Sequence, residues 1–333
     1  MNNFRPYRAF QGSLARKNQM VESLRAKWAS GQVFPLPYLK WRTDGGLVSL
    51  SGALAETQNP ELFVERTGLP VELGTLCEVL VHVGLEFRED PTSPLGLSVH
   101  GSDKIRSFGL EWLDAITVGD DLRDVLPRFM YAFLSSVLAR DFALAAHVEK
   151  SVRSSAKRIL ELWSLELNGE AVATNEWRAV RADAVRASET STDPWGYPVA
   201  ELVESCAWPA RGLATEFVPM FQLFAKSWMQ FLARPYLTTE DRDDQLLSMI
   251  GMRELARAQR DPDLSKEPSE TLLDRFPESK RAMLAVMQPE AQVRMDAAKK
   301  QARPETDFVL RAQMDVILGI IQHSNERLSP ETT

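Results

Sequence analysis

Apolar residues recur at helical spacing through most of the chain. The clearest case falls within residues 121–138, where large apolar side chains stand three or four positions apart: Leu122, Val125, Leu126, Phe129, Phe133 and Val137. Such a stripe covers one face of an amphipathic helix. The same pattern predicts helices over residues 12–29, 71–88, 103–117, 140–166, 173–188, 199–209, 212–232, 238–258, 270–275, 277–302 and 306–327. The sequence therefore predicts an all-α fold, an irregular multi-helix bundle of about eleven helices in which more than half of the residues are helical.

Prolines and polar stretches interrupt this pattern. Pro219 should kink or split the helix over 212–232, and Pro304 should separate the last two helices, because an interior proline removes a backbone hydrogen bond. Residues 89–101 are rich in turn formers and predict a loop. A minor N-terminal hairpin, Tyr38–Trp41 against Leu47–Leu50, is the only strand pairing that the first half suggests.

The domain organisation follows from composition. Residues 1–259 are expected to form one helical domain that includes a basic N-terminal segment, 1–42. Residues 260–270, rich in Asp, Pro, Ser and Glu, predict an exposed linker. Residues 271–328 are then C-terminal helices docked on the main body.

Charge divides the chain unevenly. Residues 1–42 hold eight Lys or Arg and one acid, Glu22, a net charge of +7, whereas the remainder carries 31 bases and 45 acids, a net charge of −14. An acidic body repels nucleic acid and attracts basic partners. The basic segment could bind the body's own acidic face, an anionic surface, or nothing.

Catalytic and metal-binding patterns are not found in the sequence. The four histidines, His82, His100, His147 and His323, are not at ligand spacing, and no Walker A or G-x-G-x-x-G motif occurs. Gly119-Asp120-Asp121 suits the start of a helix, where acids accept hydrogen bonds from free N–H groups, better than it suits a paired-carboxylate site. We expect no enzyme activity, no catalytic residues, no metal and no cofactor.

Cysteine use and apolar run length indicate where the chain works. Cys77 and Cys206 each sit in an apolar helical pattern and are expected to be buried free thiols. The longest apolar runs fall short of the ~20 residues that a membrane span needs, and no signal-peptide pattern opens the chain. A cytoplasmic location is the expectation.

Two features suggest contact with a partner. Trp195 lies in a polar, turn-rich loop, Asp193-Pro194-Trp195-Gly196-Tyr197, where an exposed ring could bind a partner surface. Four acids cluster at the start of the helix over 238–258: Glu240, Asp241, Asp243 and Asp244. The alternative explanation of that cluster is compensation of the helix dipole.

Several short segments carry a resemblance to a known family. They are Trp112 within Gly109–Ile116, then Gly119-Asp120-Asp121-Leu122, Arg128-Phe129, Glu176-Trp177-Arg178-Ala179 and Ala207-Trp208-Pro209. Over residues 70–212 the chain resembles the all-helical, alanine- and tryptophan-rich immunity proteins of bacterial polymorphic toxin systems. The resemblance implies a cytoplasmic protein without an active site that binds a toxin domain.

The sequence thus predicts an immunity (antitoxin-like) protein that neutralises a basic toxin domain through an acidic helical surface. One alternative is a module that binds nucleic acid or an anionic surface through the basic segment, from Arg5 to Arg42. Another is an unrecognised helical hydrolase that uses Asp120, Asp121 and His147.

Overall fold

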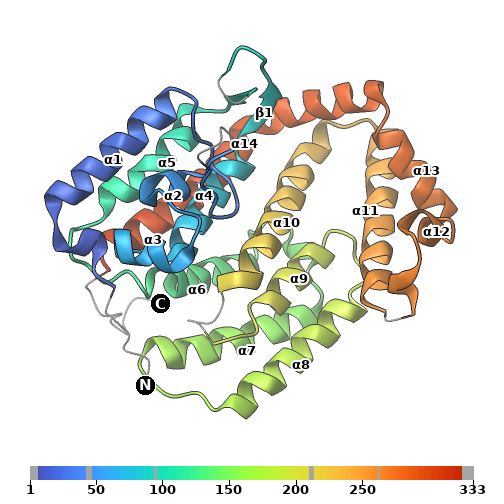
Figure 1. Cartoon of the computed structure of the whole chain (residues 1–333). Coiled ribbons are helices and arrows are strands. Elements are labelled where there is room, and N and C mark those ends of the chain that lie inside the picture. The colour runs from blue at the N-terminus through green and yellow to red at the C-terminus, as the bar shows by residue number, and fades with distance from the viewer. Residues whose placement is uncertain (1–6, 43–46, 94–95, 210–213, 262, 325–333) are drawn as a thin grey trace.

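The computed structural model describes residues 7–42, 47–93, 96–209, 214–261 and 263–324, and 71% of the chain is helical. The all-α prediction is confirmed. The described residues contain a single two-stranded sheet beside the helices. In chain order, the helices are α1 (Leu14–Ala29), α2 (Leu50–Ala55), α3 (Pro60–Thr67), α4 (Val71–Val83), α5 (Asp103–Ala115), α6 (Val125–Leu138), α7 (Lys150–Leu167), α8 (Thr174–Thr190), α9 (Tyr197–Ser205), α10 (Ala214–Ala233), α11 (Thr239–Arg260), α12 (Ser269–Leu273), α13 (Pro277–Val286) and α14 (Pro289–Gln322) (Figure 1).

Helix α4 lies at the centre of the N-terminal half. It is apolar on nearly every face and packs against α2, α3, α5, α6, α10 and α14. Its one buried acid, Glu78, accepts hydrogen bonds from the backbone N–H groups of Leu36 (3.0 Å), Leu50 (2.8 Å) and Ser51 (2.7 Å). Burial raises the pKa of Glu78 to about 7, although the amide donors oppose that shift. One side chain therefore fixes the irregular segment before α2 and the start of α2 itself.

Aromatic side chains fill the core between α6 and α10. Phe133 contacts Phe221 edge-on, with ring centroids 5.0 Å apart, and Phe224 at 5.6 Å. Phe129 stacks on Phe133 at 5.8 Å. The stripe that predicted α6 is therefore the face that joins this helix to α10.

Helix α14 crosses the molecule and contacts α4, α5, α6, α10 and α13. It runs unbroken through Pro304, so the predicted separation there is wrong. Pro304 is exposed, whereas Ala302, Thr306 and Leu310 are buried on the opposite face. That packing outweighs the roughly 3 kcal/mol that an interior proline costs.

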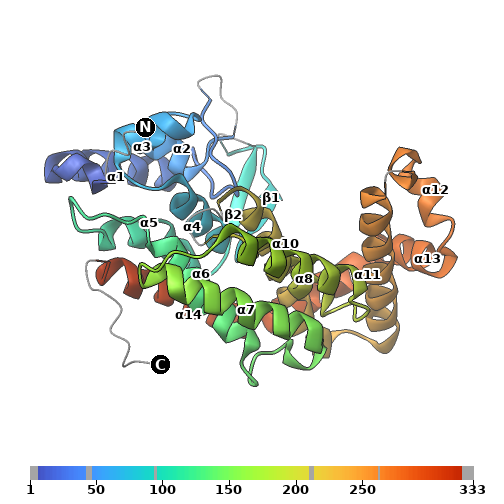
Figure 2. The same cartoon turned by 90° about the horizontal axis from the view of Figure 1, so that it is seen from below.

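Helices α11, α12 and α13 form an arm that projects from one side of the body (Figure 2). Within the arm, α11 packs against α12 and α13. Polar contacts tie it to the body: Arg257 donates to the carbonyls of Glu189 (2.8 Å) and Ser191 (2.5 Å), and Arg253 donates to that of Thr192.

The basic N-terminal segment is folded onto the body. Lys17 donates to the carbonyls of Asp114 (2.9 Å) and Ile116 (2.7 Å). Arg25 pairs with Asp114 at 3.1 Å, and Lys27 pairs with Glu56 at 3.1 Å. Three cations of this segment are thus engaged within the chain.

The strand predictions are wrong in both places. Among the described residues near the expected N-terminal hairpin, only one isolated bridge forms, between Phe34 and Ser49. The predicted loop 89–101 instead contributes to an antiparallel hairpin, β1 (Glu86–Glu89) with β2 (Leu97–His100), in which Phe87 pairs with Val99. Helices α2 and α3 were also not predicted.

The boundaries at residues 259 and 271 stay predictions. The described residues of 260–270 are exposed or half-exposed and include the start of α12. Limited proteolysis would test the expected linker.

Candidate functional site

Trp195 is buried, so the expectation of an exposed ring is wrong. Only 2% of the residue is accessible, and its ring packs edge-on against Phe231 with centroids 5.2 Å apart. Asp193 causes the inward turn, because its carboxylate accepts the N–H groups of Trp195 (2.8 Å) and Gly196 (3.0 Å). The carboxylate of Asp193 therefore satisfies the backbone of its own loop, and the Trp195 ring is buried.

The acidic cluster at the start of α11 divides into two kinds of side chain. Asp241 is buried and pairs bidentately with Arg294 of α14, at 2.7 and 2.9 Å, which lowers the pKa of Asp241. Asp244 lies 3.7 Å from Arg281 of α13. Glu240 and Asp243 are exposed. Asp241 therefore joins the arm to α14, Asp244 lies near a cation within the arm, and the other two acids face solvent.

One of the two exposed acids, Glu240, lies with the exposed Glu290 where α11, α13 and α14 meet. Glu240, Asp244, Glu290 and Arg294 line a small shared hollow of about 190 Å³. Met287 and Val293, each 69% exposed, flank it in the chain. We call Glu240, Asp244, Met287, Glu290 and Val293 the α11–α14 corner.

The residues of the hydrolase alternative are not brought together. Asp121 pairs with Arg123, and His147 Nδ1 lies 2.9 Å from Asp193 Oδ2. Asp121 precedes α6 and His147 follows it, and the contacts recorded for the two side chains are with different residues. Asp121 also does not cap α6, whose N-cap residue is Asp124. Among the described residues, no three His, Cys, Asp or Glu side chains gather as a metal site.

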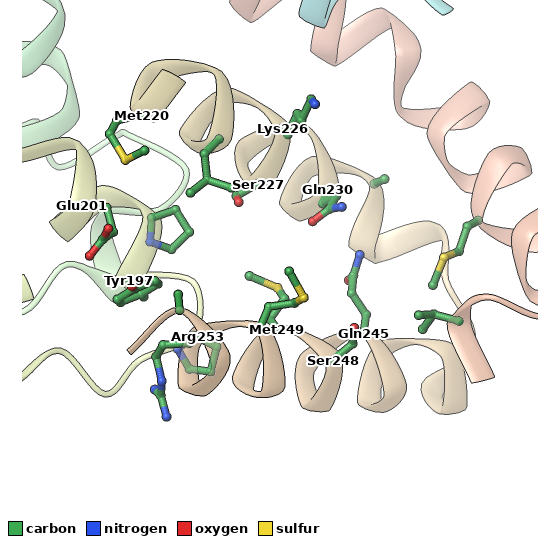
Figure 3. A pocket seen from close by; sticks show the side chains of 18 of the residues that line it. Tyr197, Glu201, Met220, Lys226, Ser227, Gln230, Gln245, Ser248, Met249 and Arg253 are labelled. Atoms are coloured by element: carbon green, nitrogen blue, oxygen red, sulfur yellow. The ribbon is translucent and has the colours of Figure 1, made fainter. Parts of the chain in front are cut away.

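A large cleft lies between α10 and α11 and is closed at one end by α9 (Figure 3). Its volume is about 730 Å³. Four methionines give it its character, two from α11, one from α10 and one from α14: Met249, Met252, Met220 and Met295. We call it the methionine cleft. Two features of the sequence could have indicated the cleft. Helix α10 is apolar on more than one face, and α11 carries Met249 and Met252 about one turn apart, which predicts an additional apolar face on each helix.

The α9 end of the cleft is polar. Glu201, 5% exposed, accepts a hydrogen bond from Ser188 Oγ of α8 at 2.5 Å and pairs with Arg260 of α11. Burial, together with the Glu201 carboxylate, raises the pKa of Tyr197, so that phenol stays neutral. Burial likewise raises the pKa of Glu204. Glu201 therefore links three helices at this end.

Comparison of the chain with protein-family models, with curated proteins and with solved structures finds no match. No helix in the described part of the chain is long and apolar enough to cross a membrane.

Proposed function

We propose that this protein is an immunity protein that binds a basic toxin domain and neutralises it. The α11–α14 corner is the proposed contact surface. The observation that carries the proposal is the combination at this corner of exposed carboxylates with exposed apolar side chains.

The charges at the corner suit a basic partner. Glu240 and Glu290 form no ion pair within the described residues. Asp241 is the main cause of the raised pKa of Arg294, and the negative charges of Glu240 and Glu290 add to it. Carboxylates that are free in this way speed the encounter with a cationic surface. The net charge of −14 outside residues 1–42 acts in the same direction over longer range.

The apolar residues at the corner supply a surface that a complex can desolvate. Of twelve large apolar side chains that are exposed in the described residues, eight follow residue 214. Leu284 lies on α13, Met287 directly after it, and Val293 near the start of α14. Exposed apolar side chains gathered in one region are typical of protein interaction sites. The resemblance of residues 70–212 to immunity proteins supports the partner class.

Co-expression tests the proposal. The gene directly upstream should encode a toxin that stops growth alone, and this protein should restore growth and co-purify with the toxin. Glu240→Arg and Met287→Asp should each weaken the complex, and its association rate should fall as salt is raised. Glu22→Arg on α1, a charge reversal far from the corner, is the matched control and should bind normally.

Two results would refute the proposal. One is a harmless upstream product, or a toxic one that neither co-purifies nor is neutralised. The other is a complex that Glu240→Arg and Glu22→Arg affect equally, which would place the contact away from the corner.

A further inference from the structure

We propose that the methionine cleft is a binding site for a neutral, largely apolar small molecule that carries one hydrogen-bond donor. The proposal does not depend on partner binding at the α11–α14 corner.

The size and lining of the cleft suit such a molecule. Pockets for small ligands run from roughly 300 to 1,000 Å³, and this one measures about 730 Å³. Leu223 (44% exposed) and Met252 (53% exposed) present apolar surface from opposite walls. Methionine side chains are flexible and polarisable, so they adapt to ligands of irregular shape.

Three of the four cations that line the cleft are held in ion pairs, which favours a neutral ligand over an anionic one. Arg253 lies 2.7 Å from Glu254, Lys299 lies 2.9 Å from Asp296, and Arg260 is held by Glu201. Lys226 is the one lining cation without an ion pair in the described chain, and its ammonium end points away from α11 (Figure 3). An anionic head group would find no free cation inside the cleft.

Gln245 gives the cleft a specific polar contact. Its side chain rises from α11 toward Gln230 of α10 (Figure 3), and the residue is only 9% exposed. Its Oε1 has no hydrogen-bond partner among the described residues. A buried amide oxygen without a partner is costly, so a ligand N–H or O–H that reaches it is stabilised.

Two neutral probes of nearly the same shape test this chemistry. N-phenyl-1-naphthylamine is apolar, fluoresces more strongly in apolar surroundings and carries one N–H, whereas 1-phenoxynaphthalene has an ether oxygen in its place. We expect saturable binding of the amine and competition by the ether with an affinity about two- to tenfold weaker, the range for one hydrogen bond. Gln245→Leu should abolish that preference while the ether still binds.

A cavity-filling variant locates the binding. Ala256→Trp places a large ring on the cleft wall and should remove binding of both probes, while Ala182→Trp on the exposed face of α8 should bind like the parent. Circular dichroism of each variant shows that it is folded, and Gln245→Leu keeps the test informative if Ala256→Trp does not fold. Absence of saturable binding by the parent protein overturns the proposal. So does unchanged binding in folded Ala256→Trp, or tighter binding of the anionic 8-sulfonate of the same amine.

Discussion

The buried hydrogen bond between Ser188 and Glu201 should be a measurable stabilising contact between α8 and α9. Ser188 is fully buried, and its hydroxyl donates to Glu201 Oε1 at 2.5 Å. Ser188→Ala removes the donor with little change in volume. Glu201→Ala removes this acceptor and leaves the buried hydroxyl only the neighbouring carboxyl of Glu204.

The expected magnitude follows from the charge of the acceptor. A hydrogen bond to an ionised group contributes about 1.5–3 kcal/mol, and leaving a buried partner unpaired costs about 1–3 kcal/mol. Ser188→Ala should therefore lower the free energy of unfolding by about 2 kcal/mol. Glu201→Ala should cost more, because Arg260 also loses its carboxylate. The loss of stability in the double mutant should be smaller than the sum of the two single losses by a coupling energy of at least about 1 kcal/mol.

Urea unfolding followed by circular dichroism measures the free energy of unfolding of the parent, the two single mutants and the double mutant. Ser154→Ala on the exposed face of α7 is the matched control and should stay within about 0.5 kcal/mol of the parent. If Ser188→Ala behaves like that control, or if the two losses simply add, the hydrogen bond does not link the helices as argued.

Three further predictions concern titration and thiol reactivity. Folding raises the pKa of Glu78 from 4.5 to about 7, so the contribution of its protonated carboxyl to the free energy of unfolding should be lost as pH rises from about 4.5 to 7. In urea unfolding, the stability of Glu78→Gln relative to the parent should therefore increase by up to about 3 kcal/mol between pH 5 and pH 8. A difference that does not change with pH would contradict this. Asp241 has the opposite sign: its pKa is lowered, chiefly by Arg294, so its contribution should be lost as pH falls below its ordinary value of 3.8, and Asp241→Asn should flatten the acid limb of the stability curve. Cys77 and Cys206 are fully buried and burial raises both thiol pKa values, so a thiol reagent should modify them only after urea unfolds the protein, and fast labelling of the native chain would refute this.

The helices that the sequence predicted best are amphipathic, with one exposed polar face and one buried apolar face. Helix α6 begins at Val125, a few residues after its predicted start, and α1 begins at Leu14. The last two helices were predicted over 277–302 and 306–327 because an interior proline weighs heavily in a local pattern, whereas the chain breaks at Met287 and Gln288, between α13 and α14. Packing of Leu310 and Met314 against the body outweighs that local cost, and such long-range contacts are not visible in a local window.

The hairpin and the start of α2 were missed for a different reason. The hairpin is only four residues long in each strand, too short for alternation to stand out. The segment around Leu36 and Leu50 is ordered by the carboxylate of Glu78, about thirty to forty positions away in sequence. A glutamate within an apolar helix is a usable signal, because a buried acid needs donors, but the sequence does not say which backbone supplies them.

The candidate sites show the same limit. The turn chemistry around Trp195 was recognised, yet the ring turned inward because Asp193 caps the backbone there. The acidic start of α11 was predicted correctly as a helix start, with Thr238 accepting the N–H of Asp241 at 3.1 Å. The sequence did not show that Asp241, unlike the exposed acids beside it, would be buried in an ion pair, because its partner Arg294 lies more than fifty residues later.

The cleft and the corner are both consequences of how α11 is attached. This helix of 22 residues, about 33 Å long, is held near its start by Asp241 with Arg294 and at its end by Arg260 with Glu201. Ion pairs at both ends fix its direction without requiring that its middle pack closely on α10. The middle carries Met249 and Met252, whose apolar surface faces the cleft. The proposed ligand site thus lies along the helix and the proposed partner site at its start, so a change in the angle of α11 would alter both.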